Sequence, residues 1–181
     1  KDILDLSGKR EKALAHFGLA GERKTILVLG GSLGARTLNQ AVLKDMKGLE
    51  KSGYQVLWQC GKFYFKEMLE KLETSKLTHI QLREFIREMD LAYAAADVIV
   101  SRAGALSVSE LSLVGKPVIF IPSPNVAEDH QTKNAMAYVD HQAALLLRDS
   151  EAVGKLKSMV DNLMQDQEMT KALGENMKKL A

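Results

Sequence analysis

Three polar segments of this sequence carry residues that can bind an anion or a sugar. The first, Gly30–Arg36 (GGSLGAR), follows an apolar run and precedes a helical pattern. Glycines let backbone N–H groups approach an anion, the start of a helix adds a partial positive charge, and Ser32 offers a hydroxyl. The spacing matches neither the G-x-G-x-x-G dinucleotide motif nor the P-loop motif. A tight strand-to-helix turn that needs glycine for steric reasons therefore stays open as the alternative.

The second segment, Ser101–Glu110 (SRAGALSVSE), permits two interpretations of its glutamate. Ser107 and Glu110 have the spacing of a capping box, in which a carboxylate in the first helical turn complements the helix dipole. Alternatively, the Glu110 carboxylate accepts hydrogen bonds from the two hydroxyls of a ribose. The residues alone leave both interpretations open.

The third segment, Asn125–Asn134 (NVAEDHQTKN), is polar and leads into a helix. His130 and Gln131 carry donors and acceptors that suit sugar hydroxyls, although a polar helix start that faces water explains the same pattern. A metal site is not expected, because His130 and His141 on one helix would lie about 16 Å apart.

These segments require a scaffold of alternating strands and helices. Apolar runs predict six strands, at 25–29, 55–59, 78–82, 97–100, 117–121 and 143–147. Helical patterns are expected at 38–47, 62–73, 89–96 and 105–114, from His130 onward, and twice near the C-terminus. Such alternation predicts a parallel sheet covered on both faces. The predicted fold class is a doubly wound, Rossmann-like α/β domain that binds its ligand beyond the carboxyl ends of the strands.

Length and composition predict one globular domain. The 181 residues are 46% hydrophobic and 27% charged, which excludes disordered and fibrous classes. The longest apolar run, residues 91–96, is far shorter than the ~20 residues of a membrane span, and no stretch predicts a signal peptide. The single cysteine, Cys60, excludes an internal disulfide, fits a reducing cytoplasm and is expected to be a passive thiol. A net charge of +2 provides no electrostatic reason to expect a nucleic-acid partner.

In combination, three stretches resemble the MurG family of bacterial peptidoglycan N-acetylglucosaminyltransferases: ILVLGGSLGARTLN, REFIREMDLAYAAADVIVSRAGALSVSELSLVGKPVIFIP and EDHQTKNA. Members of that family transfer GlcNAc from UDP-GlcNAc to lipid I, giving lipid II, at the cytoplasmic face of the membrane. The resemblance covers the C-terminal, donor-binding half of a GT-B glycosyltransferase. It implies that residues 1–181 form a single UDP-GlcNAc-binding domain, and that the acceptor-binding N-terminal half, with the membrane contact and the general base, lies outside this chain.

For the diphosphate of the donor, the resemblance implies two groups of contacts. Ser32 and Gly34 would lie beside the diphosphate. Ala105, Leu106 and Ser107 would bring the backbone amides of a helix N-terminus to the phosphates, which the helix dipole makes favourable.

For the base and the sugars, the resemblance implies side-chain and backbone contacts. Phe85 and Ile86 would lie beside the uracil, with the backbone of Ile86 pairing to the base edge. Glu110 would hold the ribose hydroxyls, and His130 and Gln131 would contact the hydroxyls of GlcNAc.

The implied reaction is a direct displacement with inversion at the anomeric carbon, without a metal or another cofactor. No residue of this chain is assigned as catalytic, so the chain alone is expected to bind the donor without transferring sugar. Other GT-B proteins are the alternatives: a split glycosyltransferase subunit, a glycolipid transferase or a UDP-sugar epimerase. A nicotinamide-dependent dehydrogenase is disfavoured, because residues 59–62 (QCGK) lack the acid that holds the adenosine ribose in that class.

Overall fold

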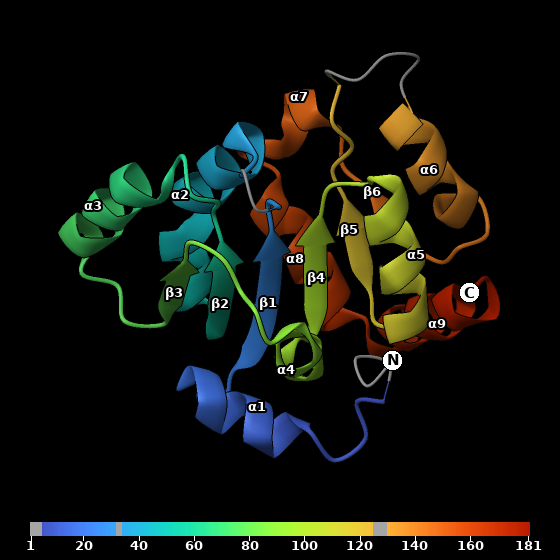
Figure 1. The fold of residues 1–181 in the computed structure, drawn as a ribbon, viewed down its shortest axis with the longest axis horizontal. Helices are drawn as coiled ribbons and strands as arrows, with labels where there is room; N and C mark the ends of the chain where they lie inside the picture. The colour runs from blue at the N-terminus through green and yellow to red at the C-terminus, as the bar shows by residue number, and fades with distance from the viewer. Residues whose placement is uncertain (1–4, 32–33, 125–129) are drawn as a thin grey trace.

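The structure is a computed structural model that describes residues 5–31, 34–124 and 130–181. Strands and helices alternate along these residues (Figure 1). The strands are β1 (Lys24–Leu29), β2 (Tyr54–Gln59), β3 (Ile80–Arg83), β4 (Val98–Ser101), β5 (Val118–Phe120) and β6 (Leu145–Leu146). The helices are α1 (Arg10–Phe17), α2 (Arg36–Lys51), α3 (Phe65–Ser75), α4 (Met89–Ala95), α5 (Ala105–Val114), α6 (His130–Val139), α7 (Asp149–Ala152), α8 (Leu156–Gln165) and α9 (Gln167–Lys179).

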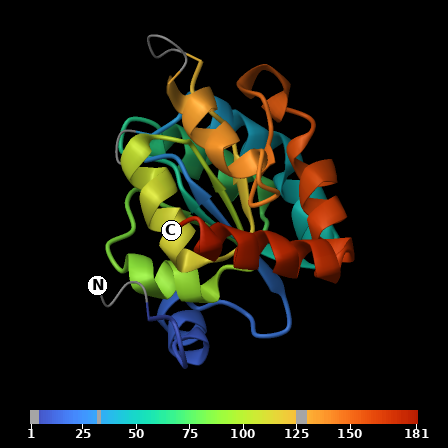
Figure 2. The same ribbon diagram turned by 90° about the vertical axis from the view of Figure 1, so that its right-hand side faces the viewer.

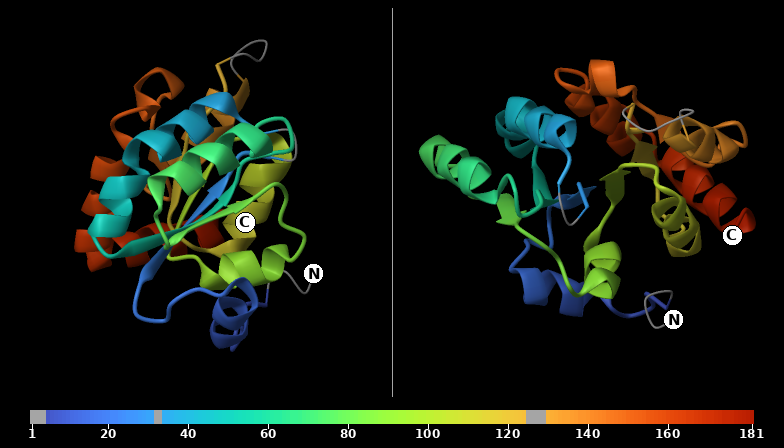
Figure 3. Two further views of the ribbon diagram at one scale, coloured as in Figure 1. Left: turned by 90° about the vertical axis from the view of Figure 1, so that its left-hand side faces the viewer. Right: turned by 45° about the horizontal axis from the view of Figure 1, so that its top comes forward.

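The strands form one six-stranded sheet in the order β3-β2-β1-β4-β5-β6, and every neighbouring pair is parallel. This is the doubly wound order of the Rossmann fold, which confirms the predicted class. The order of the chain reverses between β1 and β4, so the loops that follow these two strands diverge and leave a crevice. The right-hand view of Figure 3 turns the carboxyl ends of the strands toward the viewer.

Alternate residues of the central strands pack into two separate cores, one on each face of the sheet. Ile26, Val28 and Trp58 pack with α2, α3 and α8, whereas Leu27 and Leu57 pack with α1, α4 and α5. All five side chains are almost completely removed from solvent. Helices consequently cover both faces of the sheet (Figure 2), which explains why the strands are apolar throughout.

Two helices and one strand differ from the sequence-based expectation. The sequence patterns do not predict α1 or the single turn of α7. Helix α1 buries only Ala13 and Phe17, and Arg10 on it donates from Nη1 to the carbonyl of Ala95 at 3.2 Å, so tertiary contacts hold it. The strand expected at 143–147 is reduced to β6, which pairs with β5 at the edge of the sheet. The other expected elements are present, with ends that shift by up to four residues.

Candidate functional site

A pocket of about 330 Å³ opens at the carboxyl ends of β1 and β4, where a doubly wound sheet binds its ligand. This volume lies within the range of roughly 300–1,000 Å³ that small-molecule sites occupy. Its walls come from the ends of β1, β2 and β4, from the loops after β1, β3 and β4, and from α4 and α5. The lining residues are Leu29, Gly30, Gly31, Gln59, Phe85, Ile86, Met89, Tyr93, Ser101, Arg102, Ser107, Glu110 and Leu111.

The glycine segment after β1 contributes both pocket wall and tight packing. Gly30 and Gly31 line the pocket. Gly34 lies behind it with a φ of +92°, and a Cβ there would come within 2.7 Å of the Tyr64 ring and closer still to the carbonyl oxygen of Cys60. The steric interpretation of the segment therefore holds for Gly34. Ser32 lies outside the described residues.

A buried relay of hydrogen bonds fixes the carbonyl that packs against Gly34. The side chain of Asn39 donates from Nδ2 to the carbonyl oxygen of Cys60 at 3.0 Å, and its Oδ1 accepts from the indole Nε1 of Trp58 at 2.9 Å. Burial raises the pKa of the Cys60 thiol to about 11, and its side chain is inaccessible to solvent. Both properties favour the passive thiol that the sequence predicts.

Helix α5 presents the backbone donors of its first turn beside the pocket. It begins at Ala105 after Gly104, and its first intrahelical bond runs from the N–H of Val108 to the carbonyl of Gly104 at 3.0 Å. The amides of Ala105, Leu106 and Ser107 precede this bond and have no acceptor within the helix. Ser107 lines the pocket, whereas Ala105 and Leu106 are exposed beside it.

The capping-box interpretation of Ser107 and Glu110 is wrong. Because α5 already begins at Ala105, Ser107 is its third residue, and no side chain caps the helix. Glu110 lies in the second turn, outside the position that a capping-box carboxylate occupies. Its carboxylate instead lines the pocket. The ribose contact of Glu110 stays a prediction, and a carboxylate on the pocket wall is compatible with it.

A buried tyrosine on α4 contacts that carboxylate. The hydroxyl of Tyr93 donates a hydrogen bond to Oε2 of Glu110, and the side chain of Tyr93 also lines the pocket. The sequence analysis missed Tyr93. A signal for it exists, because Tyr93 is the only polar side chain in the apolar run 91–96, and a buried tyrosine hydroxyl needs a partner.

On another part of the pocket wall, the side chain of Gln59 contacts the backbone of Ile86, which the resemblance implies pairs with the uracil. Oε1 of Gln59 accepts a hydrogen bond from the N–H of Ile86 at 2.8 Å, and Phe85 is exposed beside it. The N–H of Ile86 is therefore already paired. Its carbonyl accepts no hydrogen bond within residues 5–31, 34–124 and 130–181. Gln59 is almost fully buried and was also missed, although a polar residue at the end of a central strand marks the crevice.

Gln131 holds two loops together next to the pocket, and neither it nor His130 lines the cavity. Its Oε1 accepts from the backbone N–H of Ala103 at 3.1 Å and of Ser123 at 2.8 Å. Asn134, one turn later on α6, donates to the carbonyl of Ala103 at 3.0 Å. The start of α6 therefore sets the position of the chain that leads into α5.

A basic side chain on the pocket wall also fixes the loops. Nη1 of Arg102 donates to the carbonyls of Ile121 and Pro122, at 3.1 and 3.2 Å, and to Oδ1 of Asp149 at 2.5 Å. The other carboxylate oxygen of Asp149 accepts from the hydroxyl of Thr37 on α2 at 3.1 Å. This arrangement joins β4, α7 and the start of α2 at the site.

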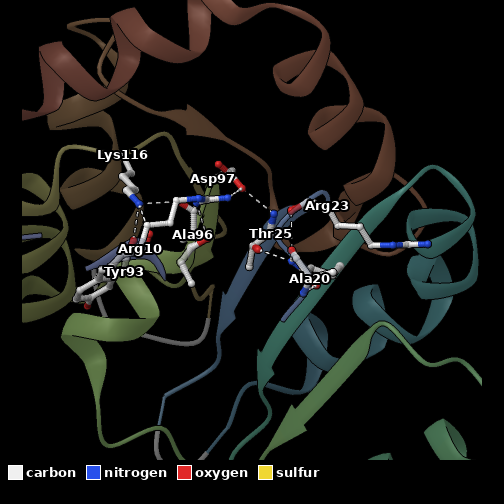
Figure 4. Close-up of polar contacts among 11 residues, drawn as sticks. Arg10, Ala20, Arg23, Thr25, Tyr93, Ala96, Asp97 and Lys116 are labelled. Carbon is white, nitrogen blue, oxygen red and sulfur yellow. Dashed lines mark hydrogen bonds and ion pairs between the residues drawn. The ribbon is translucent and has the colours of Figure 1, made fainter. Parts of the chain in front are cut away.

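A partly buried lysine secures α4 from the opposite end of the sheet (Figure 4). Nζ of Lys116 donates to three carbonyl oxygens at the end of this helix, at 2.7 to 3.0 Å, those of Tyr93, Ala94 and Ala96. Burial lowers the pKa of Lys116 to about 8; the nearby Arg10 acts in the same direction and Asp97 opposes it.

Two kinds of feature are absent from the part of the chain that the structure describes. It contains no group of three or more His, Cys, Asp or Glu side chains arranged to hold a metal ion. It also contains no helix of the length and apolar character needed to cross a membrane.

Comparison with known proteins assigns the chain to a family. Residues 25–181 match the model described as "Glycosyltransferase family 28 C-terminal domain". Two curated relatives, from Flavobacterium psychrophilum and Christiangramia forsetii, are 49% and 50% identical over the whole chain. Both are named UDP-N-acetylglucosamine--N-acetylmuramyl-(pentapeptide) pyrophosphoryl-undecaprenol N-acetylglucosamine transferase. The chain spans about half the length of these relatives, 48% of each.

The crystal structure of MurG from Acinetobacter baumannii superimposes with a TM-score of 0.80 at 28% identity, over 99% of this chain and 50% of that one. The chain belongs to the glycosyltransferase family 28 C-terminal domain family.

Proposed function

We propose that this domain binds UDP-GlcNAc as the donor half of an N-acetylglucosaminyltransferase that converts lipid I to lipid II in peptidoglycan synthesis. The observation that carries the proposal is one pocket whose wall includes Ser107, in the first turn of α5, together with the side chain of Glu110. Backbone amides at a helix N-terminus suit the diphosphate, and a carboxylate suits a ribose diol. The names of relatives that are about half identical over the whole chain support the choice of donor.

In the proposed complex, different residues in and beside the pocket recognise the different parts of UDP-GlcNAc. The uracil would lie against Phe85 with its edge at the carbonyl of Ile86, and Glu110 would accept hydrogen bonds from both ribose hydroxyls. The diphosphate would meet the amides of Ala105, Leu106 and Ser107. Since Gln131 already holds the loops beside α5, its contact with GlcNAc would come from Nε2, and His130 would lie next to it at the start of α6.

The chemistry that follows from this arrangement is stabilisation of a leaving group. When an acceptor hydroxyl attacks the anomeric carbon of GlcNAc, the bond to the UDP oxygen breaks and negative charge accumulates on the diphosphate. Preorganised amides and the partial positive charge of α5 favour that charge in the transition state. None of the side chains on the pocket wall of this domain is assigned as the base that removes the proton from the acceptor.

The acceptor site would belong to the other half of a longer protein. In this proposal that half binds lipid I, supplies the general base and makes the peripheral contact with the cytoplasmic side of the bacterial inner membrane. The domain by itself would bind UDP-GlcNAc without producing lipid II. Formation of lipid II by the 181-residue chain alone would contradict this division of roles.

A nucleotide lacking its diol tests the proposal directly. We expect calorimetry to show that Glu110→Gln weakens UDP binding by about 1.5–3 kcal/mol, the range for hydrogen bonds to a charged group. Wild-type protein should bind 2′,3′-dideoxyuridine diphosphate about as poorly as Glu110→Gln binds UDP, and the substitution should add little further loss for this probe.

Glu88→Gln is the matched control, because Glu88 precedes α4 and does not line the pocket. It should bind UDP as the wild type does. Unchanged UDP affinity in Glu110→Gln, with its thermal unfolding transition intact, would remove the ribose contact from the proposal.

A further inference from the structure

We infer that Tyr93 is a positioning residue of the nucleotide site: its hydroxyl holds the carboxylate of Glu110 in the orientation that binds a ribose diol. The inference rests on the proposed function, since it needs Glu110 to contact the ribose. In this role Tyr93 acts on the ribose through the side chain of Glu110.

The first argument is the geometry of the carboxylate. Tyr93 donates to Oε2 of Glu110, and both side chains lie on the wall of the pocket. An ionised carboxylate has about four lone-pair sites, so one bond from Tyr93 leaves Oε1 and part of Oε2 for two ribose hydroxyls. Without this bond, the side chain of Glu110 can rotate, and a ligand would have to order it on binding.

The second argument is that Tyr93 is itself firmly held. Its side chain is only 2% exposed, within the core that α4 and α5 share. Its carbonyl accepts a hydrogen bond from the partly buried ammonium of Lys116 at 2.7 Å. A group that orients a ligand-binding side chain must be more rigid than the side chain it orients, and Tyr93 meets this condition.

The third argument is that the hydroxyl keeps its proton. Burial, together with the hydrogen bond and the charge of Glu110, raises the pKa of Tyr93. The hydroxyl therefore remains a donor at physiological pH, and the direction of the hydrogen bond to the carboxylate does not change.

The test is calorimetry with UDP and with 2′,3′-dideoxyuridine diphosphate on Tyr93→Phe, Glu110→Gln and the double variant. We expect Tyr93→Phe to weaken UDP binding about 5- to 20-fold and to change binding of the dideoxy probe less than 2-fold, an order of magnitude based on bonds to charged groups. The double variant should bind UDP no more weakly than Glu110→Gln, because Tyr93 acts only through that carboxylate.

Tyr54→Phe is a matched control. Tyr54 also donates from its hydroxyl to a carboxylate, Oδ1 of Asp161 at 2.7 Å, but it lies at the amino-terminal end of β2, outside the pocket. This control should lose stability comparably and keep its UDP affinity.

Two results would overturn the role of Tyr93. The first is wild-type UDP affinity in a folded Tyr93→Phe protein. The second is an equal loss for UDP and the dideoxy probe, which would indicate disturbed packing. In both cases a preference of the wild type for UDP over the dideoxy probe would leave the proposed function standing. If the wild type and Glu110→Gln bind both nucleotides alike, the ribose contact fails and the inference fails with it.

Discussion

Arg102 and Asp149 form an ion pair across the site, 2.5 Å between Nη1 and Oδ1, with each side chain 18% exposed. The pair connects the end of β4 to the first residue of α7, 47 residues later in the chain. Arg102 also donates to two loop carbonyls, so its guanidinium serves three acceptors. The loop that leads into α5 is thereby attached to the rest of the domain by a charged side chain.

Removal of this charge should destabilise the domain. We expect Arg102→Met to lower the free energy of unfolding by about 2–4 kcal/mol, because it leaves a largely buried carboxylate without its partner. The control is Lys155→Met, which breaks the pair with Glu151, where the side chains are 60% and 48% exposed. Urea denaturation should show a loss of at most about 0.5 kcal/mol for the control. Equal losses in the two variants would contradict the structural importance of the Arg102 pair.

The packing of Gly34 can be separated from its backbone conformation. Gly34 and Gly53 have almost the same φ, +92° and +93°, but a Cβ on Gly53 would meet nothing within 4 Å. Gly53→Ala should therefore cost about 1–2 kcal/mol of stability from the left-handed backbone alone. Gly34→Ala should cost about 1–3 kcal/mol more, because its Cβ would overlap the Cys60 carbonyl.

The same pair of variants also reports on the pocket. Gly34→Ala should weaken UDP binding, since the displaced loop carries Gly30 and Gly31 on the pocket wall, and Gly53→Ala should not. Thermal unfolding and calorimetry on both proteins provide the measurements. The steric argument would be wrong if the two alanine variants were equally stable.

Lys116 should make stability rise with pH over an alkaline window. Its pKa in the folded protein is about 8, against 10.5 ordinarily, so between these values the unfolded chain binds more protons than the folded one. The free energy of unfolding therefore increases as pH rises from about 8 toward 10. In Lys116→Gln this contribution is missing, so the stability of wild type minus that of the variant should grow by roughly 1–2 kcal/mol across the window. Parallel pH profiles for the two proteins would exclude the effect.

Cys60 should react with thiol reagents only when the protein opens. Burial raises the pKa of its thiol to about 11, so at pH 8 very little thiolate is present and none is accessible. We expect labelling of the native protein to be at least about 100-fold slower than labelling in 6 M urea, and UDP to slow it further by stabilising the folded state. Rapid stoichiometric labelling of the folded protein would show that the thiol is accessible.

The fold was largely predictable because its strongest signals are local. The strands β1, β2 and β4 are buried on both faces, and such strands appear in the sequence as short, nearly continuous apolar runs. Helix α1 escaped prediction for the opposite reason, since its stability comes from Arg10 and Phe17 packing against residues about 80 positions away. Local propensity contains no information about such contacts.

The sequence motifs predicted where the candidate site lies, but they did not predict which side chains hydrogen-bond to its residues. The sequence placed Glu110 near the start of a helix, but the capping box needs Ser107 as the N-cap, and the observed N-cap, Gly104, lies three residues earlier. The hydrogen bonds of Tyr93 and Gln59 connect residues 17 and 27 positions apart through the sheet order. No spacing rule along the chain brings those pairs together.

Trp58 is the only tryptophan of the chain, and its buried indole is hydrogen-bonded to Asn39. Asn39 in turn holds the carbonyl of Cys60 against the glycine segment. An indole in this setting is an intrinsic fluorophore beside the residues that support the glycine segment, shielded from water and free of competing emission from other tryptophans. Its emission maximum should consequently change with the solvation of Trp58 and its surroundings. Partial opening of the glycine segment and global unfolding then become separable optical signals without any label.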